Sequence, residues 1–395
     1  MTAERTATTG PAASVAPPAR GSGPARWLGV PVAIYAVSRV VQFVFIAWML
    51  PAANPGEPAT VRSRLLAWDA GWLIRVARDG YPHGYSYDAR GVRVGNGLAF
   101  FPGYPLAVRV VHELTRLSYP SAALTLSWMA GAAAAVGVYA LGRRLYDARV
   151  ATMLTVLFCT QPMSVVLSMA YSEGLFVALA TGALLAAHRR AWLVAGLVGL
   201  AATLTRPTGA ALAVGLAIAA LTEVVGGRPG RWRAVGAAAM AAAGVPAYLW
   251  WVADRVGTWH AWFDIQTAGW GSTFDFGLGT ARFVRDALRA GDTWVQVSVA
   301  LIVIAAVVAA VLALTHRVWP PLLGYGLTAL VLALGQDGYY HSKPRLLVPV
   351  LVIGVPPAIA LARARTRTAV LVATGCALFG LWYGAYLLAV WPFAI

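Results

Sequence analysis

Long apolar runs separated by short polar connectors form the main pattern along this chain of 395 residues. We interpret eleven of these runs as membrane-spanning helices. They cover residues 27–50, 119–142, 150–168, 172–188, 191–205, 207–225, 234–253, 294–315, 318–335, 346–362 and 368–390. The stretch 98–118 contains Pro, Arg, His and Glu among its apolar residues, which predicts a helix lying partly in the membrane interface. The pattern therefore predicts an all-α, polytopic transmembrane bundle of about eleven spans, with interfacial helices in the first outer loop.

The start of the first apolar run, at residue 27, separates a short N-terminal tail from the rest of the chain. Residues 1–26 are rich in Ala, Pro, Thr and Gly, which predicts a disordered tail. The run that follows is too long for a signal-peptide core and has no convincing cleavage site, so we expect a retained span. Residues 27–395 then form one transmembrane domain, in which three polar loops stand out, at 51–97, 254–293 and 336–345.

Composition supports a membrane protein and excludes a nucleic-acid-binding one. Hydrophobic residues make up 59% of the chain and charged residues only 12%, about half the charged share of a soluble protein. The net charge of +16 comes from arginines near the ends of apolar runs, where they anchor to lipid headgroups. Cys159 and Cys376 lie inside apolar segments and predict neither a disulfide framework nor a metal site.

Short arginine clusters set the expected orientation, because cytoplasmic loops carry an excess of Lys and Arg. With a cytoplasmic tail, the inner connectors hold Arg143 and Arg144, Arg189 and Arg190, Arg228, Arg231 and Arg233, Arg317, and Arg363, Arg365 and Arg367. The same assignment puts nearly every unusual polar residue on the outer face. We therefore expect a multi-pass plasma-membrane protein with a cytoplasmic N-terminus and its chemistry on the extracytoplasmic side.

Asp69 is the first candidate for chemistry. At about 100° per residue, a helix through 65–76 places Asp69 in the middle of an apolar face that includes Leu66 and Trp72. The positions three and four residues away hold no cation. A carboxylate against apolar surface costs free energy unless it has a partner or a task, and proton transfer from a hydroxyl is one such task. A structural contact with a neighbouring loop or helix end is the alternative.

Four cations on the outer face are candidates for binding a phosphate, namely Arg206, His341, Lys343 and Arg345. Positive charge at the outer end of a span opposes the usual bias, and a phosphate would justify it. Lys343 is the one lysine of the chain, and a compact ammonium can approach a phosphate where a guanidinium does not fit. Arg206 can equally contact lipid headgroups, and the position of the single lysine can be chance.

Glu173 and an aromatic loop complete the outer-face candidates. Glu173 starts a span after Ser172, where an acid also stabilises the helix dipole. The loop 254–293 holds Trp259, Trp262 and Gln266, and aromatic rings beside polar groups suit a sugar. An ordinary aromatic belt at the membrane interface is the alternative. The chain has no Walker loop, no dinucleotide-binding glycine turn and no convincing His or Cys metal set.

In this order the motifs resemble those of the PIG-V-like mannosyltransferases, the family of GPI mannosyltransferase 2, in the GT-C superfamily of membrane glycosyltransferases. The matching stretches run from about residue 60 to 350. They are Trp68-Asp69 with Trp72, "GYP" at 80–82, "FFPGYPLAVR" at 100–109, "QPMSVVLSMAYSEGLF" at 161–176, "LTRPTG" at 204–209 and "HSKPRLLVP" at 341–349. "TRPTG" matches the eukaryotic pattern only in part. The arginine bias suggests a bacterial genome, so a GPI acceptor is not carried over.

The resemblance implies a GT-C fold and transfer of a sugar, typically mannose, from a polyprenyl phosphate on the non-cytoplasmic face, with inversion. The family's catalytic aspartate, in the first outer loop, corresponds to Asp69, and the four cations above would bind the donor phosphate. Nine further residues are expected to bind substrate: Trp68, Trp72, Tyr104, Tyr171, Glu173, Trp259, Trp262, Gln266 and Tyr340. We expect no cofactor and no obligatory metal. The expected partners are membrane lipids, a lipid-linked donor and a lipid or glycan acceptor.

Three alternatives remain at this point. A transporter or lipid flippase would also combine many spans with charged residues, although it should place them at mid-membrane depth. The same enzyme class could use glucose, arabinose or a protein acceptor. A catalytically silent GT-C relative could serve as a structural subunit.

Overall fold

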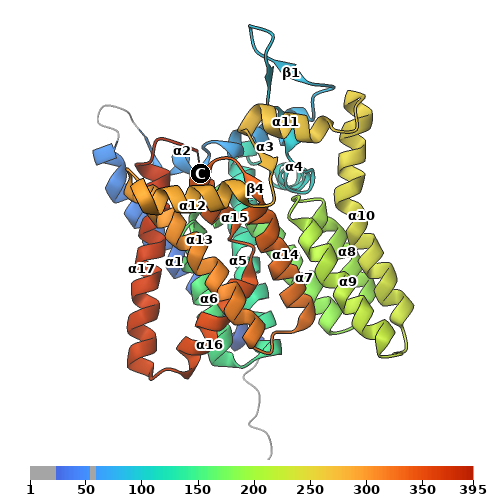
Figure 1. The fold of residues 1–395 in the computed structure, drawn as a ribbon, viewed down its shortest axis with the longest axis vertical. Coiled ribbons are helices and arrows are strands. Elements are labelled where there is room, and N and C mark those ends of the chain that lie inside the picture. Colours follow the sequence, from blue (N-terminus) through green and yellow to red (C-terminus); the bar gives the residue numbers. More distant parts are fainter. Residues whose placement is uncertain (1–23, 54–58, 395) are drawn as a thin grey trace, which may run out of the picture.

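The computed structural model describes residues 24–53 and 59–394, and it is a helical bundle (Figure 1). Residues 1–23 of the tail predicted at 1–26 lie outside the described residues, and helix α1 begins at Pro24, three residues earlier than the predicted span. The helices that match the predicted spans are α1 (Pro24–Ala53), α5 (Tyr119–Leu145), α6 (Ala148–Thr160), α7 (Glu173–His188), α8 (Trp192–Thr203), α9 (Gly209–Val225), α10 (Arg231–Val256), α13 (Trp294–Thr315), α14 (Pro320–Gly335), α15 (Lys343–Leu346) with α16 (Val355–Arg363), and α17 (Thr366–Ala389).

All eleven predicted segments contain helix, but a count of eleven spans is not confirmed. Five of the described helices are long and apolar enough to cross a membrane: α1, α5, α10, α13 and α17. A sixth span would be the pair at 340–346 and 351–363, which is bent by 77°. Helices α6, α7, α8, α9 and α14 are apolar but only 10–17 residues long. The structure therefore supports a multi-pass membrane protein with five or six full-length apolar spans.

The elements of the polar loops gather at one end of the bundle. In Figure 1, α3, α4, α11 and β1 lie at this end, and α16 lies near the other. These elements are α2 (Val61–Leu65), α3 (Asp69–Asp79), α4 (Gly103–Thr115), α11 (Ala261–Trp270) and α12 (Leu278–Ala290), with 3-10 turns at Gly97–Ala99 and Tyr340–Ser342. Two further 3-10 turns, Ser164–Leu167 and Leu351–Gly354, precede α7 and α16. Two antiparallel pairs join them, β1 (Ser86–Tyr87) with β2 (Arg93–Val94) and β3 (Thr273–Phe274) with β4 (Gln336–Asp337).

The predicted continuous helix through Asp69 is wrong. Helix α2 ends at Leu65, and α3 begins at Asp69 after a break at Trp68, whose backbone has a φ of 56°. A positive φ cannot be part of a right-handed helix, so the apolar periodicity of 65–76 spans two separate elements. Asp69 therefore lies in the first turn of α3, where the helix dipole favours a carboxylate.

A buried arginine fixes the turn between α6 and α7. Arg39 of α1 donates hydrogen bonds to the carbonyl oxygens of Ser164, at 2.5 Å, and Cys159, and to the side chain of Gln42. The carbonyl of Cys159 lies in the last turn of α6, where intrahelical donors are missing, and buried backbone oxygens need donors. The contact holds in place the segment that leads to Glu173.

Two glycines, Gly269 of α11 and Gly95 directly after β2, allow these two segments to pack against each other in close contact. A Cβ atom on Gly269 would lie 2.7 Å from the Cα atom of Gly95, so neither position has room for a side chain. Tyr248 of α10 donates to the carbonyl oxygens of Leu98 and Phe100 in the same region. The loop before α4 is thereby fixed between α10 and α11.

We expect Gly269→Ala to lower the free energy of unfolding by about 1–3 kcal/mol, because its methyl group collides with backbone that must move. The matched control is Gly236→Ala in α10, where a Cβ atom meets nothing within 4 Å. That change should be neutral or stabilising by up to about 1 kcal/mol. Thermal unfolding of the purified chain in detergent compares the two. An equal stability of both variants would mean that the Gly95 contact is not tight.

Candidate active site

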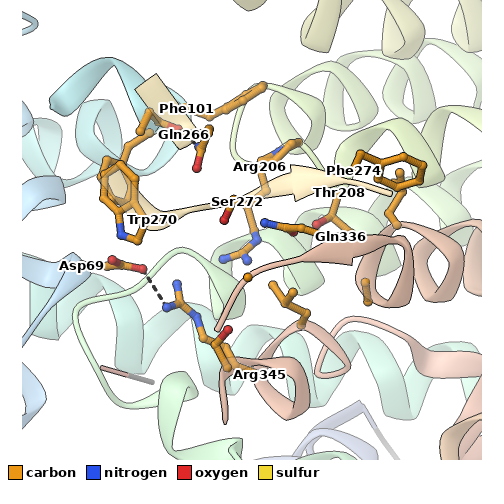
Figure 2. A pocket seen from close by; sticks show the side chains of 18 of the residues that line it. Asp69, Phe101, Arg206, Thr208, Gln266, Trp270, Ser272, Phe274, Gln336 and Arg345 are labelled. Atoms are coloured by element: carbon orange, nitrogen blue, oxygen red, sulfur yellow. Dashed lines mark hydrogen bonds and ion pairs between the residues drawn. The ribbon is translucent and has the colours of Figure 1, made fainter. Parts of the chain in front are cut away.

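A cavity of about 630 Å³ opens among the elements at this end of the bundle (Figure 2). Its polar lining comes from segments far apart in the sequence: Asp69 from α3, Arg206 from the turn before α9, Gln266 from α11, and Lys343 and Arg345 from α15. Apolar side chains cover the remaining wall, among them Leu73, Phe101, Val245, Leu249, Trp262, Phe263, Phe274, Leu332 and Leu346. A largely apolar cavity with a few convergent polar groups is typical of a ligand site.

An ion-pair network joins four of the predicted residues. Arg345 Nη1 lies 2.7 Å from Asp69 Oδ2, and Arg345 Nε lies 2.5 Å from Glu173 Oε1. The same Glu173 oxygen lies 2.8 Å from Arg206 Nη1. Glu173 is fully buried, and Arg206 and Arg345 are nearly so. Two carboxylates thus balance two guanidiniums, which is the condition for holding charges out of water.

Asp69 is oriented from two sides. Its carboxylate faces Arg345, as the dashed line in Figure 2 marks, and its backbone N–H donates to the hydroxyl of Tyr171 at 3.3 Å. The ring of Tyr171 lies 4.2 Å from the guanidinium carbon of Arg345, which is a cation–π contact. These contacts fix the direction of a carboxylate at the cavity wall.

Lys343 lines the cavity but already has partners. Its ammonium donates to the carbonyl oxygen of Gln336 and, at 3.4 Å, to that of Ala333. Ala333 belongs to the last turn of α14, where carbonyl oxygens lack intrahelical donors. The lysine therefore stabilises a helix end and can contribute its charge to the cavity at the same time.

The aromatic side of the cavity is built on α11. Trp262 Nε1 and Gln266 Nε2 both donate to the carbonyl oxygen of Ala99, at 3.3 and 3.1 Å. Trp270 packs edge-on against Phe100, with ring centroids 5.3 Å apart. These contacts hold the Trp262 indole and the Gln266 amide in the cavity wall, where Figure 2 labels Gln266 and Trp270.

A polar cluster outside the cavity holds α11 on the β1–β2 hairpin. Asp264 Oδ2 accepts hydrogen bonds from the hydroxyl of Tyr85 at 2.7 Å and from Arg93 Nη1 at 2.8 Å, and it lies 2.8 Å from His260 Nδ1. The hydrogen bond from Tyr85 is the main reason that the pKa of Asp264 lies below its usual range. The cluster gives α11 a second attachment besides the Gly269 contact.

The remaining predicted residues do not line the cavity. Tyr171 and Glu173 lie directly behind Arg345, as described above. Trp68 is half-buried beside the core, and Trp72 packs edge-on against Trp270. Trp259 is 82% exposed, and Tyr340 stacks on Phe283 of α12. His341 is buried against Phe393 and, unlike the other three cations, does not line this cavity.

Tyr104 lies in the core and not at the cavity. Its hydroxyl contacts Ser127 Oγ at 2.7 Å and the carbonyl oxygen of Ala123 at 3.0 Å. We expect Tyr104→Phe to lower the free energy of unfolding by about 1–2 kcal/mol, because buried partners lose a hydrogen bond, and to leave substrate affinity unchanged. Thermal unfolding and substrate titration measure the two effects, with exposed Tyr87→Phe as the control. If Tyr104→Phe weakened substrate affinity and left the free energy of unfolding unchanged, Tyr104 would be a substrate-binding residue after all.

Several lining residues are absent from the prediction. They are Phe101, Thr208, Ser272, Phe274 and Gln336. Phe101 and Thr208 belong to the motifs "FFPGYP" and "TRPTG", so the sequence held a signal for them. Ser272 and Phe274 reach the cavity through the β3–β4 pair, which no local pattern indicates. Within the described residues, no group of three or more His, Cys, Asp or Glu side chains could hold a metal ion.

Comparison with known proteins adds an independent finding. Residues 59–215 match the family described as Mannosyltransferase (PIG-V). The chain is 36% identical over 149 residues to GPI alpha-1,6-mannosyltransferase 2 of Mus musculus, which covers 35% of this chain and 28% of that protein. The human protein of the same name is 35% identical over 127 residues, covering 30% and 24%. The chain thus spans less than a third of the length of these curated relatives.

Among solved structures, the chain resembles ArnT from Cupriavidus metallidurans in the apo state. The TM-score is 0.50 with 17% identity, over 92% of this chain and 76% of that one. At this identity the likeness concerns the fold alone. The resemblance to the PIG-V-like mannosyltransferases is confirmed by sequence over residues 59–215, and over most of its length the chain resembles ArnT in fold.

Proposed function

We propose that this protein is a membrane glycosyltransferase that transfers mannose from a polyprenyl phosphate to a hydroxyl group of a lipid-linked or glycan acceptor, with inversion. One observation carries the proposal. A single cavity holds a carboxylate, Asp69, together with three cations, Arg206, Lys343 and Arg345. A glycosyl phosphate brings a negative charge and an electrophilic carbon, and the reaction needs a base on one side and positive charge on the other.

In the proposed reaction, Asp69 accepts the proton of the acceptor hydroxyl. The hydroxyl oxygen bonds to the anomeric carbon, and the bond from that carbon to the phosphate oxygen breaks from the opposite side. The phosphate takes the bonding electron pair, and the cationic wall stabilises the charge that develops there. Arg206 and Lys343 are the nearest candidates for this task, since Arg345 also fixes the direction of Asp69.

The apolar wall supports a lipid-linked substrate over a free sugar nucleotide. Phe263 and Phe274, both about half exposed, and Leu249 of α10 line the cavity and provide apolar surface for a hydrocarbon chain. The indole and amide groups of α11 offer stacking and hydrogen bonds to a sugar ring. From the arginine distribution, we further propose that the N-terminus is cytoplasmic and that the cavity opens on the outer face of the plasma membrane.

The experiment is transfer of radiolabelled sugar in membranes that contain or lack the expressed chain. Polyprenyl-phosphate mannose, glucose and arabinose are supplied separately, and label is counted in lipid and protein fractions. We expect chain-dependent label from the mannose donor in the lipid fraction, and competition by unlabelled polyprenyl phosphate. An absence of chain-dependent transfer from every donor would contradict the proposal and favour a transporter or a silent subunit.

A further inference from the structure

A second cavity lies at the end of the bundle remote from the candidate active site. Its volume is about 200 Å³, and it is bordered by the last turns of α7 and α9 and the first residues of α8 and α14. Glu173 and His188 occupy the two ends of α7, which are roughly 22 Å apart at 1.5 Å per residue. The two cavities therefore cannot share one small ligand.

A buried carboxylate holds two arginines together at this second cavity. Glu223 Oε1 lies 2.9 Å from Arg228 Nη1, and Glu223 Oε2 lies 3.4 Å from Arg190 Nε. The carboxylate side chain is only 6% exposed, whereas both guanidiniums are about half exposed. An acid in the last turn of a helix is opposed by the helix dipole, so its burial there requires compensation. The two arginines provide it, and they remain accessible from the cavity.

The charges at the wall favour an anion that carries a hydrogen-bond donor. Two guanidiniums against one carboxylate leave a single positive charge, and guanidinium groups match the oxygens of a phosphate. The N-terminal ends of α8 and α14 add positive dipole ends beside Trp192 and Trp319. Within the described residues, Glu223 Oε2 receives no hydrogen bond. This oxygen is buried at the cavity wall beside Arg190 and, among these residues, lacks a hydrogen-bond donor, which a hydroxyl or ammonium group of the ligand would supply.

We propose that this cavity binds the phosphate of a phospholipid headgroup through Arg190 and Arg228, while Glu223 accepts a hydrogen bond from the headgroup's hydroxyl or ammonium. Phosphatidylglycerol and phosphatidylethanolamine combine these two features. The ends of apolar helices are where headgroups lie in a membrane, and indole rings such as that of Trp319 are common at that depth. In the sequence, Arg190 and Arg228 indicate only which side of the membrane their loops occupy. In the structure both contact Glu223 at the cavity, which is the arrangement that the proposed binding site needs.

The test uses the full chain in detergent, with bound lipids counted by native mass spectrometry as phosphatidylglycerol or phosphatidylethanolamine is added. Wild type should retain one tightly bound phospholipid, and Arg190→Gln/Arg228→Gln should bind it at least tenfold more weakly. The matched control is Arg231→Gln/Arg233→Gln, which removes the same charge from the start of α10 outside the cavity and should bind as wild type does. Equal affinity in all three proteins would overturn the proposal.

Two further arms identify the ligand. Phosphatidylcholine has no hydrogen-bond donor in its headgroup, so wild type should bind it more weakly than phosphatidylethanolamine, and Glu223→Gln should reduce that difference. Titration with inorganic phosphate distinguishes a free anion from a lipid: arginine-dependent binding of phosphate without arginine-dependent binding of lipid would overturn the headgroup assignment. Because the measurement is binding, it does not depend on the proposed transferase activity.

Discussion

Replacing Asp69 by Asn should reduce the rate of sugar transfer by about 10²–10⁴-fold, the usual contribution of a general base. Asparagine keeps the shape of the side chain but cannot accept a proton from the acceptor hydroxyl. The change also removes the negative partner of Arg345, at 2.7 Å, but Glu173 still faces that guanidinium. The fold should therefore persist, and the measurement is the rate of label transfer at matched protein amounts.

Asp79→Asn is the control for this experiment. Asp79 lies at the other end of the same helix, α3, and pairs with Arg78 in an exposed position. An exposed ion pair contributes little, so we expect unchanged transfer. Equal rates for wild type and Asp69→Asn would remove Asp69 as the base.

Replacing Glu173 by Gln should lower the free energy of unfolding by about 3–5 kcal/mol and abolish transfer. The carboxylate is fully buried and is shared by Arg206 and Arg345, so its loss leaves two buried guanidiniums with one carboxylate, and Arg206 with none. Asp69 would then be the remaining negative partner of Arg345, and the direction of both side chains would change. Thermal unfolding in detergent measures the stability.

Two comparisons separate charge compensation from general disruption. Glu113→Gln removes an exposed acid that pairs with Arg116 on α4, and it should change stability by no more than about 0.5 kcal/mol. The double variant Glu173→Gln/Arg206→Gln removes one charge of each sign and should regain part of the lost stability. If the double variant is less stable than Glu173→Gln alone, the ion-pair explanation is wrong.

The sequence predicts the helices better than the breaks between them. All eleven segments predicted from apolar runs contain helix, because burial and membrane solvation both select apolar side chains. The break at Trp68 was missed because a non-glycine residue with positive φ leaves no mark in an apolar periodicity. The bend between α15 and α16 is not predicted for a similar reason, since the apolar segment 346–362, which contains Pro349 and Pro356, is interpreted as a single span.

For the candidate site, the sequence likewise predicts the individual residues better than the contacts between them. Motif order brought Asp69, Arg206 and Arg345 forward as candidates, and the structure brings them together. Their pairing could not be predicted, because Asp69 and Arg345 are 276 residues apart and meet only after α3 and α15 pack at one end of the bundle. Spacing alone also grouped His341 with Lys343, whereas the 3-10 turn at Tyr340–Ser342 directs the imidazole toward the C-terminal segment.

In the proposed reaction, Arg206 binds the donor phosphate while Asp69 acts only on the acceptor hydroxyl. The most direct test is the dissociation constant of polyprenyl phosphate for the purified chain, measured for wild type, Asp69→Asn and Arg206→Gln. We predict that Asp69→Asn binds as tightly as wild type or more tightly, and that Arg206→Gln binds at least tenfold more weakly. Loss of binding in Asp69→Asn, or unchanged binding in Arg206→Gln, would contradict this division of roles.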